Sequence, residues 1–411
     1  MTHRILLITN SYPSGDSIEK NFIHEEVESL IDSGFSVSVM PFNYSGSCDD
    51  SFRGELIDSL SKNKSFLNLS LLLLLLIFRK GFWCEVKENY LLIFTSLRRL
   101  KNLFKYSLKS EIVRRVLLRQ SNNKYDVVYT YWCSGESIAV AELVEQNKID
   151  IYTVTRMHGF DIYEERDYNN GYIPYRKRVL AELDKVIVLS KQAKTYLLSK
   201  YPEVLDKIFI SPLGVRAKPE QPQAKWDCGV TNFFSCSYPA PVKRLDKILA
   251  VVSNYAKNNS EISVSWDHFG CAESESMLRI MDLPGNLRIS FHGRTPKEVF
   301  MQHYCNAETP LFINMSDSEG QPVSIMEAMS CALPVLATDV GGVSEVIGPD
   351  SGVLVSSGDE VSIIAARIGD LVQNEADYLR ASSASLNRQR ENYDVHKNHR
   401  RLSQKLRTWC E

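Results

Sequence analysis

Two glutamates separated by seven residues follow a short apolar segment, and the residues between them are those of a helix start. Glu319 falls on the connecting loop, and Pro322 suits the first helical turn because its missing N–H costs nothing there. The free amides of Val323 and Ser324 then point out of the helix start, as an anion site suited to a diphosphate. Glu327, about one turn into the helix, is placed to accept hydrogen bonds from a ribose.

The same pattern also fits a structural role, namely a capped helix that carries two solvated glutamates. An acidic residue near a helix start is stabilising in any helix, so the local pattern alone leaves both interpretations open. The Gly341-Gly342 pair further along has a structural explanation as well, because a tight turn before a helix can require positive φ. Those glycines are therefore not included in the predicted site.

The elements that must position these residues alternate along the chain. Short segments that are apolar at nearly every position are typical of parallel strands covered on both faces. Amphipathic helical stretches separate them. In the first half, the predicted strands are 5–9, 37–40, 127–130, 151–155, 186–189 and 208–211.

A polar segment at 216–225, with two prolines and no periodicity, predicts a linker. The alternation then restarts, and the predicted strands of the second half are 233–236, 263–266, 287–291, 311–314, 334–337 and 353–355. Two such arrays predict an α/β protein with two doubly wound, Rossmann-like domains facing across a cleft. Ligands of such sheets bind at the carboxyl ends of the strands, so the cleft is the expected site.

The chain length of 411 residues suits two domains of about 200 residues each. The first domain is predicted at 1–215, with a basic helical insertion at about 62–120. A linker at 216–226 leads to the second domain at 227–390. A basic terminal helix at 391–411 ends the chain and could return to the first domain.

The composition is that of a globular protein, with 44% hydrophobic and 24% charged residues. A net charge of −2 gives no reason to expect nucleic-acid binding. The nine cysteines form no Cys-x-x-Cys pair, which argues against a disulfide framework or a zinc site and for a reducing compartment. Most of them are expected to be small buried hydrophobes.

Two features bear on membranes. The longest mostly apolar run, at 66–78, is shorter than the roughly 20 residues that span a bilayer, and the apolar run at the N-terminus is too short for a signal peptide. We therefore expect a cytoplasmic protein. Between Arg79 and Arg119 stand 11 Lys/Arg and 3 Glu, with aromatic and aliphatic residues between them. This region could dock on anionic lipid, or it could be an ordinary helical insertion with a solvated basic face.

The segment from Glu319 through Glu327 continues as Leu333-Pro-Val-Leu-Ala-Thr-Asp-Val-Gly-Gly-Val-Ser-Glu345. It resembles the signature of the large retaining GT-B glycosyltransferase family (family 4-like, group 1), many members of which build bacterial surface polysaccharides. The resemblance covers nearly the whole chain, and Pro212-Leu-Gly-Val215 matches the end of the first domain. The loop at 10–16, with a single glycine, fits less well than the glycine-rich loop usual there.

The resemblance also implies residue roles. Lys243 occupies the lysine position of a basic pair that neutralises the diphosphate leaving group. Tyr238 stands at the arginine position of that pair, and Arg244 is adjacent to the lysine instead. His158, in the segment His-Gly-Phe-Asp161, resembles a histidine that contacts the donor sugar.

The same resemblance places the remaining contacts around the donor. Glu319, with Gly320 beside it, would contact the donor sugar, and Glu327 the ribose. Arg294 lies in a segment matched to the loop near the nucleotide base. Separately, Tyr131 and Trp132 follow a predicted strand and could line an acceptor groove or simply pack in the core.

The function implied is a retaining, metal-independent transfer from a nucleotide-diphosphate sugar, UDP- or GDP-linked, to a glycan or lipid-linked glycan. The nucleotide sugar would be a substrate, and no cofactor is expected. Another GT-B activity, such as a nucleotide-sugar epimerase or a phosphorylase, stays open. So does a catalytically inactive glycan-binding scaffold. The expected partners are the donor and the acceptor, but no nucleic acid. An anionic membrane surface stays open as a further partner.

Overall fold

The computed structural model describes residues 3–17, 19–66, 75–119, 124–217, 222 and 224–411. It divides into two compact units, of which the first comprises 1–211 and 399–411 and the second comprises 212–398. Much of the predicted apolar run at 66–78 and part of the predicted linker at 216–226 lie outside the described residues. Across the described ranges, no helix is both long and apolar enough to cross a membrane.

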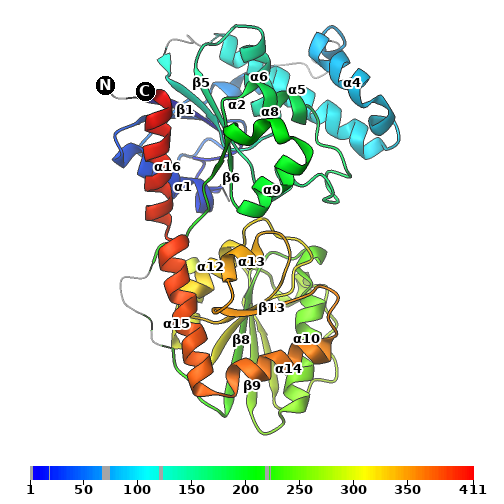
Figure 1. Ribbon diagram of the computed structural model, residues 1–411, viewed down its shortest axis with the longest axis vertical. Coiled ribbons are helices and arrows are strands. Elements are labelled where there is room, and N and C mark those ends of the chain that lie inside the picture. The colour runs from blue at the N-terminus through cyan, green and yellow to red at the C-terminus, as the bar shows by residue number, and fades with distance from the viewer. Residues whose placement is uncertain (1–2, 18, 67–74, 120–123, 218–221, 223) are drawn as a thin grey trace. The chain divides into compact units, whose positions relative to one another are not determined.

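The first unit is built on a parallel sheet of seven strands in the order β3-β2-β1-β4-β5-β6-β7 (Figure 1). The strands are β1 (Arg4–Thr9), β2 (Ser36–Pro41), β3 (Glu55–Leu56), β4 (Val127–Thr130), β5 (Tyr152–Arg156), β6 (Lys185–Val188) and β7 (Ile208–Ile210). Its helices are α1 (Lys20–Asp32), α2 (Ser59–Phe66), α4 (Lys80–Ile93), α5 (Leu97–Arg119), α6 (Gly135–Glu145), α7 (Gly159–Ile162), α8 (Arg176–Glu182) and α9 (Lys191–Lys200).

Strand β1 shows why these segments are apolar at successive positions. Ile5 and Leu7 belong to one buried cluster, which also contains residues of α1. Leu6 and Ile8 belong to another, which contains residues of α5, α6 and α8. Successive side chains of a strand point to opposite faces, so a sheet covered by helices on both faces needs apolar residues throughout.

The second unit has a parallel sheet of six strands in the order β10-β9-β8-β11-β12-β13. The strands are β8 (Val230–Cys236), β9 (Ser263–Phe269), β10 (Leu287–Phe291), β11 (Pro310–Asn314), β12 (Val335–Thr338) and β13 (Gly352–Val355). The helices are α10 (Leu245–Asn258), α11 (Lys297–Asn306), α12 (Val323–Ser330), α13 (Val343–Ile347), α14 (Val361–Val372) and α15 (Glu375–Asn392). Residues of α10 and α14 pack on one face, and residues of α11, α12 and α13 pack on the other.

The chain ends in α16 (Val395–Cys410), most of which belongs to the first unit. Leu402 and Leu406 are fully buried there, in the cluster that also holds Ile5 and residues of α1. At the end of the helix, the Arg407 guanidinium donates to the carbonyl oxygen of Ser33. The basic character of α16 is therefore a solvated face opposite an apolar one.

The predicted doubly wound α/β architecture is confirmed in both units. The two-residue strand β3 was not predicted, because two residues carry no periodicity. The expectation that most cysteines are buried is wrong. Only three of the nine are buried, while Cys48, Cys84 and Cys228 are exposed and the others are intermediate. All nine are free thiols.

Candidate functional site in the second unit

Glu319 and Lys243 form an ion pair at the carboxyl ends of two neighbouring parallel strands. Glu319 follows β11 on a loop, and Lys243 ends a 3-10 turn after β8. The Lys243 ammonium donates to Oε1 of Glu319 at 2.7 Å, and the Asn314 amide donates to the same oxygen at 3.4 Å. Both charged side chains are largely buried, at 15% and 10% exposed. The structure thus joins two residues that are 76 positions apart in the sequence.

A glycine pair holds the backbone of the Glu319 loop. Gly341 has φ of +56°, and a Cβ atom there would lie 1.9 Å from the carbonyl oxygen of Glu319. The next residue, Gly342, donates its N–H to the carbonyl oxygen of Gly320 at 3.0 Å. A side chain at 341 would therefore displace the loop that carries the carboxylate. The sequence indicated only a tight turn at these glycines, because the close approach to Glu319 is a tertiary contact.

Helix α12 starts one residue later than the sequence suggested. Pro322 is the N-cap, with φ of −76° and ψ of 105°, rather than a residue of the first turn. Val323 and Ser324 are then the first two helical residues, and their amides have no acceptor within the helix. The positive end of the α12 dipole therefore lies on the same loop as Glu319.

Glu327 also has a cationic partner, and the sequence did not reveal it. The Lys297 ammonium lies 2.8 Å from Oε1 of Glu327, whose side chain is 13% exposed. Lys297 is the first residue of α11, and no recognised motif pointed to it. Both predicted acidic residues of the site are thus paired with lysines that come from other elements.

Arg244 has other partners. It adopts a left-handed conformation, with φ of 49°, at the cap of α10. Its guanidinium pairs with Asp246 at 3.0 Å and with Asp317 at 3.1 Å. Tyr238, at the position where an arginine was expected, is 63% exposed, and its ring centroid lies 5.5 Å from the Lys243 ammonium. Lys243 is thus the cation that contacts Glu319, while Arg244 pairs with surface carboxylates.

Arg294 is exposed on the loop after β10. Among the described residues, Glu319 and Glu327 pair with Lys243 and Lys297, not with Arg294. Its neighbour His292 stacks on Phe269, with ring centroids 4.5 Å apart, and lies 2.6 Å from a carboxylate oxygen of Asp267. The contacts of His292 therefore anchor the loop that carries Arg294. The exposed Arg294 side chain takes no part in these contacts.

His158 belongs to the first unit, unlike the other predicted site residues. It is the N-cap of α7, where its N–H donates to Asp161, and Asp161 also accepts from the Cys133 amide at 2.9 Å. The imidazole packs on Trp132, with ring centroids 4.1 Å apart. Burial and the nearby Arg156 charge lower the pKa of His158 well below its usual value. The ring is therefore neutral near pH 7, and within the described residues neither ring nitrogen has a hydrogen-bond partner.

Glu19 organises the loop after β1, a role that the sequence did not indicate. Its carboxylate accepts from the backbone amides of Ser11 and Tyr12, at 2.5 and 2.8 Å. It also accepts from the indole N–H of Trp132. These backbone amides of the loop at 10–16, which has a single glycine, are thus bound by a side-chain carboxylate. Tyr131 is fully buried, which confirms the packing alternative for this residue, whereas Trp132 is partly exposed.

In the described part of the chain, no cluster of three or more His, Cys, Asp or Glu side chains has the arrangement of a metal site. The polar groups at the carboxyl ends of β8 and β11 are instead cations, carboxylates and the free amides of a helix start. Such a set can bind a phosphorylated ligand and its sugar hydroxyls without an added ion.

Part of the chain is similar in sequence to known glycosyltransferases. Residues 231–374 match the family model described as "Glycosyl transferases group 1". The amylovoran biosynthesis glycosyltransferase AmsK of Erwinia amylovora is 29% identical over 144 residues, or 33% of this chain and 35% of AmsK. The chain spans between 22% and 59% of the lengths of the curated relatives that it matches.

Solved structures match over nearly the whole chain. Sucrose-phosphate synthase from Thermosynechococcus elongatus has a TM-score of 0.65 at 14% identity and covers 99% of this chain and 98% of its own. The protein HepE of Anabaena, in complex with UDP-glucose, has a TM-score of 0.58 at 14% identity and covers 98% and 99%. At such identities the likeness shows the fold, which is GT-B, as predicted. The chain therefore has the GT-B fold, and its residues 231–374 match the glycosyltransferase group 1 family model.

Proposed function

We propose that this protein transfers a sugar from a nucleotide-diphosphate donor to a glycan or lipid-linked glycan, and that the second unit holds the donor. The observation that carries the proposal is the Lys243–Glu319 pair beside the start of α12. A departing nucleoside diphosphate gains negative charge, which fixed cations and oriented N–H donors stabilise in the transition state. Lys243 and the amides of Val323 and Ser324 supply both.

The acidic residues would then bind the neutral parts of the donor. Glu319 is assigned to the hydroxyls of the sugar, and Glu327 to the ribose. Each carboxylate is held by a lysine, and this pairing would keep it in place for the donor. Lys297 thus enters the proposal as a positioning residue for Glu327. Arg244 would reach the diphosphate only by leaving Asp246 and Asp317.

The charge distribution also bears on the class of reaction. Because cations and amides can stabilise the leaving group, we assign the reaction to the metal-independent class. We assign retention of the anomeric configuration from the resemblance of the segment 319–345 to the retaining family. His158 is assigned to the donor sugar, where a neutral imidazole can exchange hydrogen bonds with hydroxyls. A UDP- or GDP-linked sugar is the proposed donor, and HepE, a structural neighbour, is known in complex with UDP-glucose.

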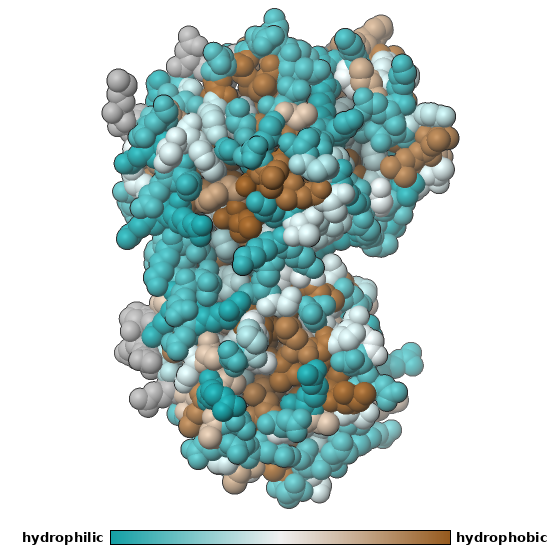
Figure 2. All heavy atoms as spheres, in the orientation of Figure 1, coloured by the Kyte–Doolittle hydropathy of each residue, from teal (hydrophilic) through white to brown (hydrophobic). Residues whose placement is uncertain are grey.

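The proposed setting is surface polysaccharide biosynthesis at the cytoplasmic face of a membrane. AmsK carries amylovoran biosynthesis in its name. Hydrophobic surface gathers over α4 and the start of α5, at the right-hand edge of the view in Figure 2. Leu91, Phe94 and Leu97 are 67% to 77% exposed there, and Arg98 and Lys101 follow at once. Apolar side chains next to basic ones suit the interface of an anionic lipid surface.

A donor screen tests the function. The purified chain is incubated with UDP- and GDP-sugars, and release of nucleoside diphosphate is followed with and without a panel of oligosaccharide acceptors. We expect release from one donor, at a rate that excess EDTA leaves unchanged, and a product with the anomeric configuration of the donor. No release from any donor would contradict the proposal. Loss of activity in EDTA would contradict its metal-independent form.

A further inference from the structure

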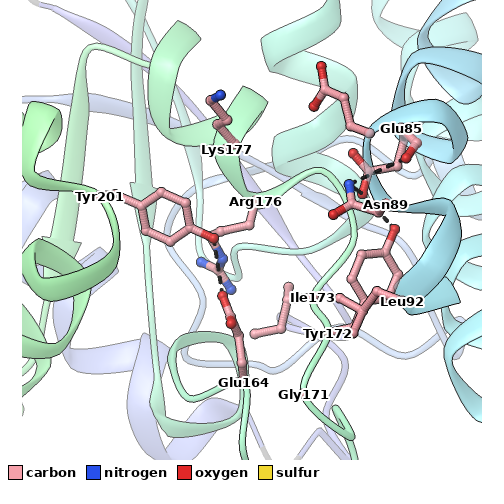
Figure 3. Close-up of a pocket in the computed structure, with 11 residues that line it drawn as sticks. Glu85, Asn89, Leu92, Glu164, Gly171, Tyr172, Ile173, Arg176, Lys177 and Tyr201 are labelled. Atoms are coloured by element: carbon pink, nitrogen blue, oxygen red, sulfur yellow. Dashed lines mark hydrogen bonds between the residues drawn. The ribbon is translucent and has the colours of Figure 1, made fainter.

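A cavity of about 480 Å³ lies within the first unit, between α4 and the segment that leads into α8 (Figure 3). Its volume falls within the roughly 300–1,000 Å³ typical of small-ligand sites. None of its lining residues belongs to the site proposed above. Two groups of polar side chains face each other across it, with Leu92 and Ile173 between them in the close-up.

The first polar group comes from α4. Glu85 is buried, and its Oε1 accepts from the Tyr172 hydroxyl at 2.5 Å and from the Asn89 amide at 3.2 Å. Burial raises the pKa of the Glu85 carboxyl. A carboxyl, an amide and a phenol are thus assembled on one wall, and the contacts among them fix their positions.

The second polar group lies on the opposite wall. Glu164 accepts from the Tyr201 hydroxyl at 3.1 Å and from the Lys200 ammonium at 2.7 Å. Arg176 is only 4% exposed, and Figure 3 shows its guanidinium directed toward Tyr201 and Glu164. Within the described residues its Nε has no hydrogen-bond partner. A buried cation and a hydrogen-bonded carboxylate and phenol thus form this wall, and they offer charge and hydrogen-bonding groups to a polar ligand.

A second cavity continues the first one along α4. It has a volume of about 550 Å³ and shares Glu85, Glu88 and Lys177 with the first cavity. Most of the α4 residues that line the two cavities have neighbours in the set three or four positions away, the spacing of one helix face. The α4 residues are Lys80, Gly81, Cys84, Glu85, Glu88, Asn89 and Leu92. We call the two cavities together the α4 groove.

The charges of the α4 groove nearly balance, which decides the class of ligand. Its lining contains four glutamates and five basic residues, namely Glu85, Glu88, Glu145, Glu164, Arg79, Lys80, Arg176, Lys177 and Arg178. A polyanion or a polycation would meet like charges along its length. An extended neutral ligand with many hydroxyls would find donors, acceptors and apolar surface throughout, as carbohydrates require.

We propose that the α4 groove is a second glycan-binding site, which holds several sugar units of an oligosaccharide apart from the residues assigned to the donor. This inference deepens the proposed transfer reaction. It rests on that reaction only for the expectation that a glycan is a substrate of this protein. Arg176 links the α4 groove to His158, because its guanidinium also donates to the carbonyl oxygen of Asp161, the residue that caps the His158 turn.

The test measures oligosaccharide binding by the full-length chain in the absence of donor. Saturation-transfer NMR and calorimetry are applied with hexasaccharides of glucose, N-acetylglucosamine, mannose and galactose, with spermidine as a cationic probe. Glu88 and Lys177 are exposed and line both cavities, so Glu88→Ala/Lys177→Ala should fold normally. We expect at least one hexasaccharide to bind, and binding to weaken tenfold or more in this variant and in Glu88→Trp, which fills the α4 groove.

The matched control is Lys87→Ala/Glu203→Ala, which makes the same change in charge at exposed positions of the first unit outside the α4 groove. It should bind like the wild type. Binding of UDP and GDP is measured in parallel and should be unchanged in all variants. A wild-type chain that binds neither nucleotide would count against the donor proposal and not against the α4 groove. The inference is overturned if no hexasaccharide binds or if the α4 groove variants bind normally. Tighter binding of spermidine than of any sugar, lost in the same variants, would also overturn it.

Discussion

At the scale of single residues, the proposed donor site combines charges that neutralise one another before any ligand arrives. Glu319 is paired with Lys243, and Glu327 with Lys297. Each pair is more than half buried, so breaking it by removing one partner would leave an uncompensated charge. The pairing therefore serves to hold side chains in place as well as to provide charge.

The close contact of Gly341 with the Glu319 loop gives a prediction at this scale. Gly341→Ala places a Cβ atom on the carbonyl oxygen of Glu319 at a positive φ, so the loop must shift. We expect a loss of stability on the order of 1–3 kcal/mol and a larger loss of transfer activity. Thermal unfolding and donor turnover measure the two effects. Gly358→Ala is the control, because the nearest atom to a Cβ there is 3.9 Å away and it should match the wild type. Normal turnover by Gly341→Ala would contradict the role of this contact.

The sequence identified the acidic residues but not what holds them. Glu319, Glu327 and Lys243 were recognisable because a long motif and its resemblance to a family contained them. Lys297 and Glu19 were not, because each acts on a partner that only the folded sheet brings near. The Arg244 contacts could not be foreseen either, since they depend on a left-handed backbone residue and two surface carboxylates.

At the scale of elements, α4 presents two different faces. One lines the α4 groove with polar residues, and the other exposes Trp83, Tyr90 and Leu91. Exposed apolar side chains gathered on one helix are typical of an interaction surface. The basic residues of α4 and of the start of α5 flank them.

Vesicle flotation tests whether this surface binds lipid. We expect the chain to float with vesicles of phosphatidylglycerol and phosphatidylcholine, because apolar insertion and charge attraction act together. Leu91→Ser/Phe94→Ser should reduce the floated fraction severalfold, and 0.5 M salt should reduce it as well. The control Leu205→Ser changes a residue that is 51% exposed elsewhere in the first unit, and it should float normally. A wild-type chain that stays unbound would refute the docking proposal.

Most strands were predictable because their apolar patterns come directly from burial on both faces of a parallel sheet. The alternating cluster membership of Ile5 and Leu6 on β1 is one example. Strand β3 was not predictable because it is too short to show a period. The α4 groove was also beyond the sequence, because its walls are α4, the residues around Arg176 and Tyr201, which are far apart along the chain.

At the scale of the whole molecule, the chain leaves the first unit after Ser211 and returns to it at His399. One buried charge cluster in the first unit contacts both of these residues. The Arg156 guanidinium donates to the carbonyl oxygen of Ser211, the last residue before the chain leaves the first unit. Arg156 also pairs with Glu26 at 2.9 Å, and His399, the first residue after the chain returns, lies 3.8 Å from Glu26. The C-terminal end of the chain is therefore an integral part of the first unit.

Three buried histidines predict how stability depends on pH. Burial lowers the pKa of His158, His268 and His399, in the case of His268 to about 4. At these three sites the folded chain binds fewer protons than the unfolded chain below pH 6.5, so the stability that they contribute is lost as the pH falls from 6.5 toward 4. The His268 contribution would reach on the order of 3 kcal/mol at the acid end.

Thermal unfolding between pH 7.5 and 4.5 checks this dependence. The unfolding midpoint should fall with pH, and His268→Asn, which can keep the hydrogen bond to Ser235, should show a shallower fall. His396→Asn changes an exposed histidine and should follow the wild type. Equal slopes for all three proteins would mean that His268 does not contribute.

The central claim is that Lys243 and Glu319 act on the donor in the transfer reaction. The most direct measurement is turnover of the donor found by the screen, for the wild type, Lys243→Ala, Glu319→Ala and the surface control Lys257→Ala. We predict that each site variant loses at least about 100-fold in kcat, the usual effect of removing one group that stabilises transition-state charge. Unfolding midpoints should show that both variants remain folded, and Lys257→Ala should be unaffected. Normal turnover by a folded Lys243→Ala or Glu319→Ala variant would contradict the account.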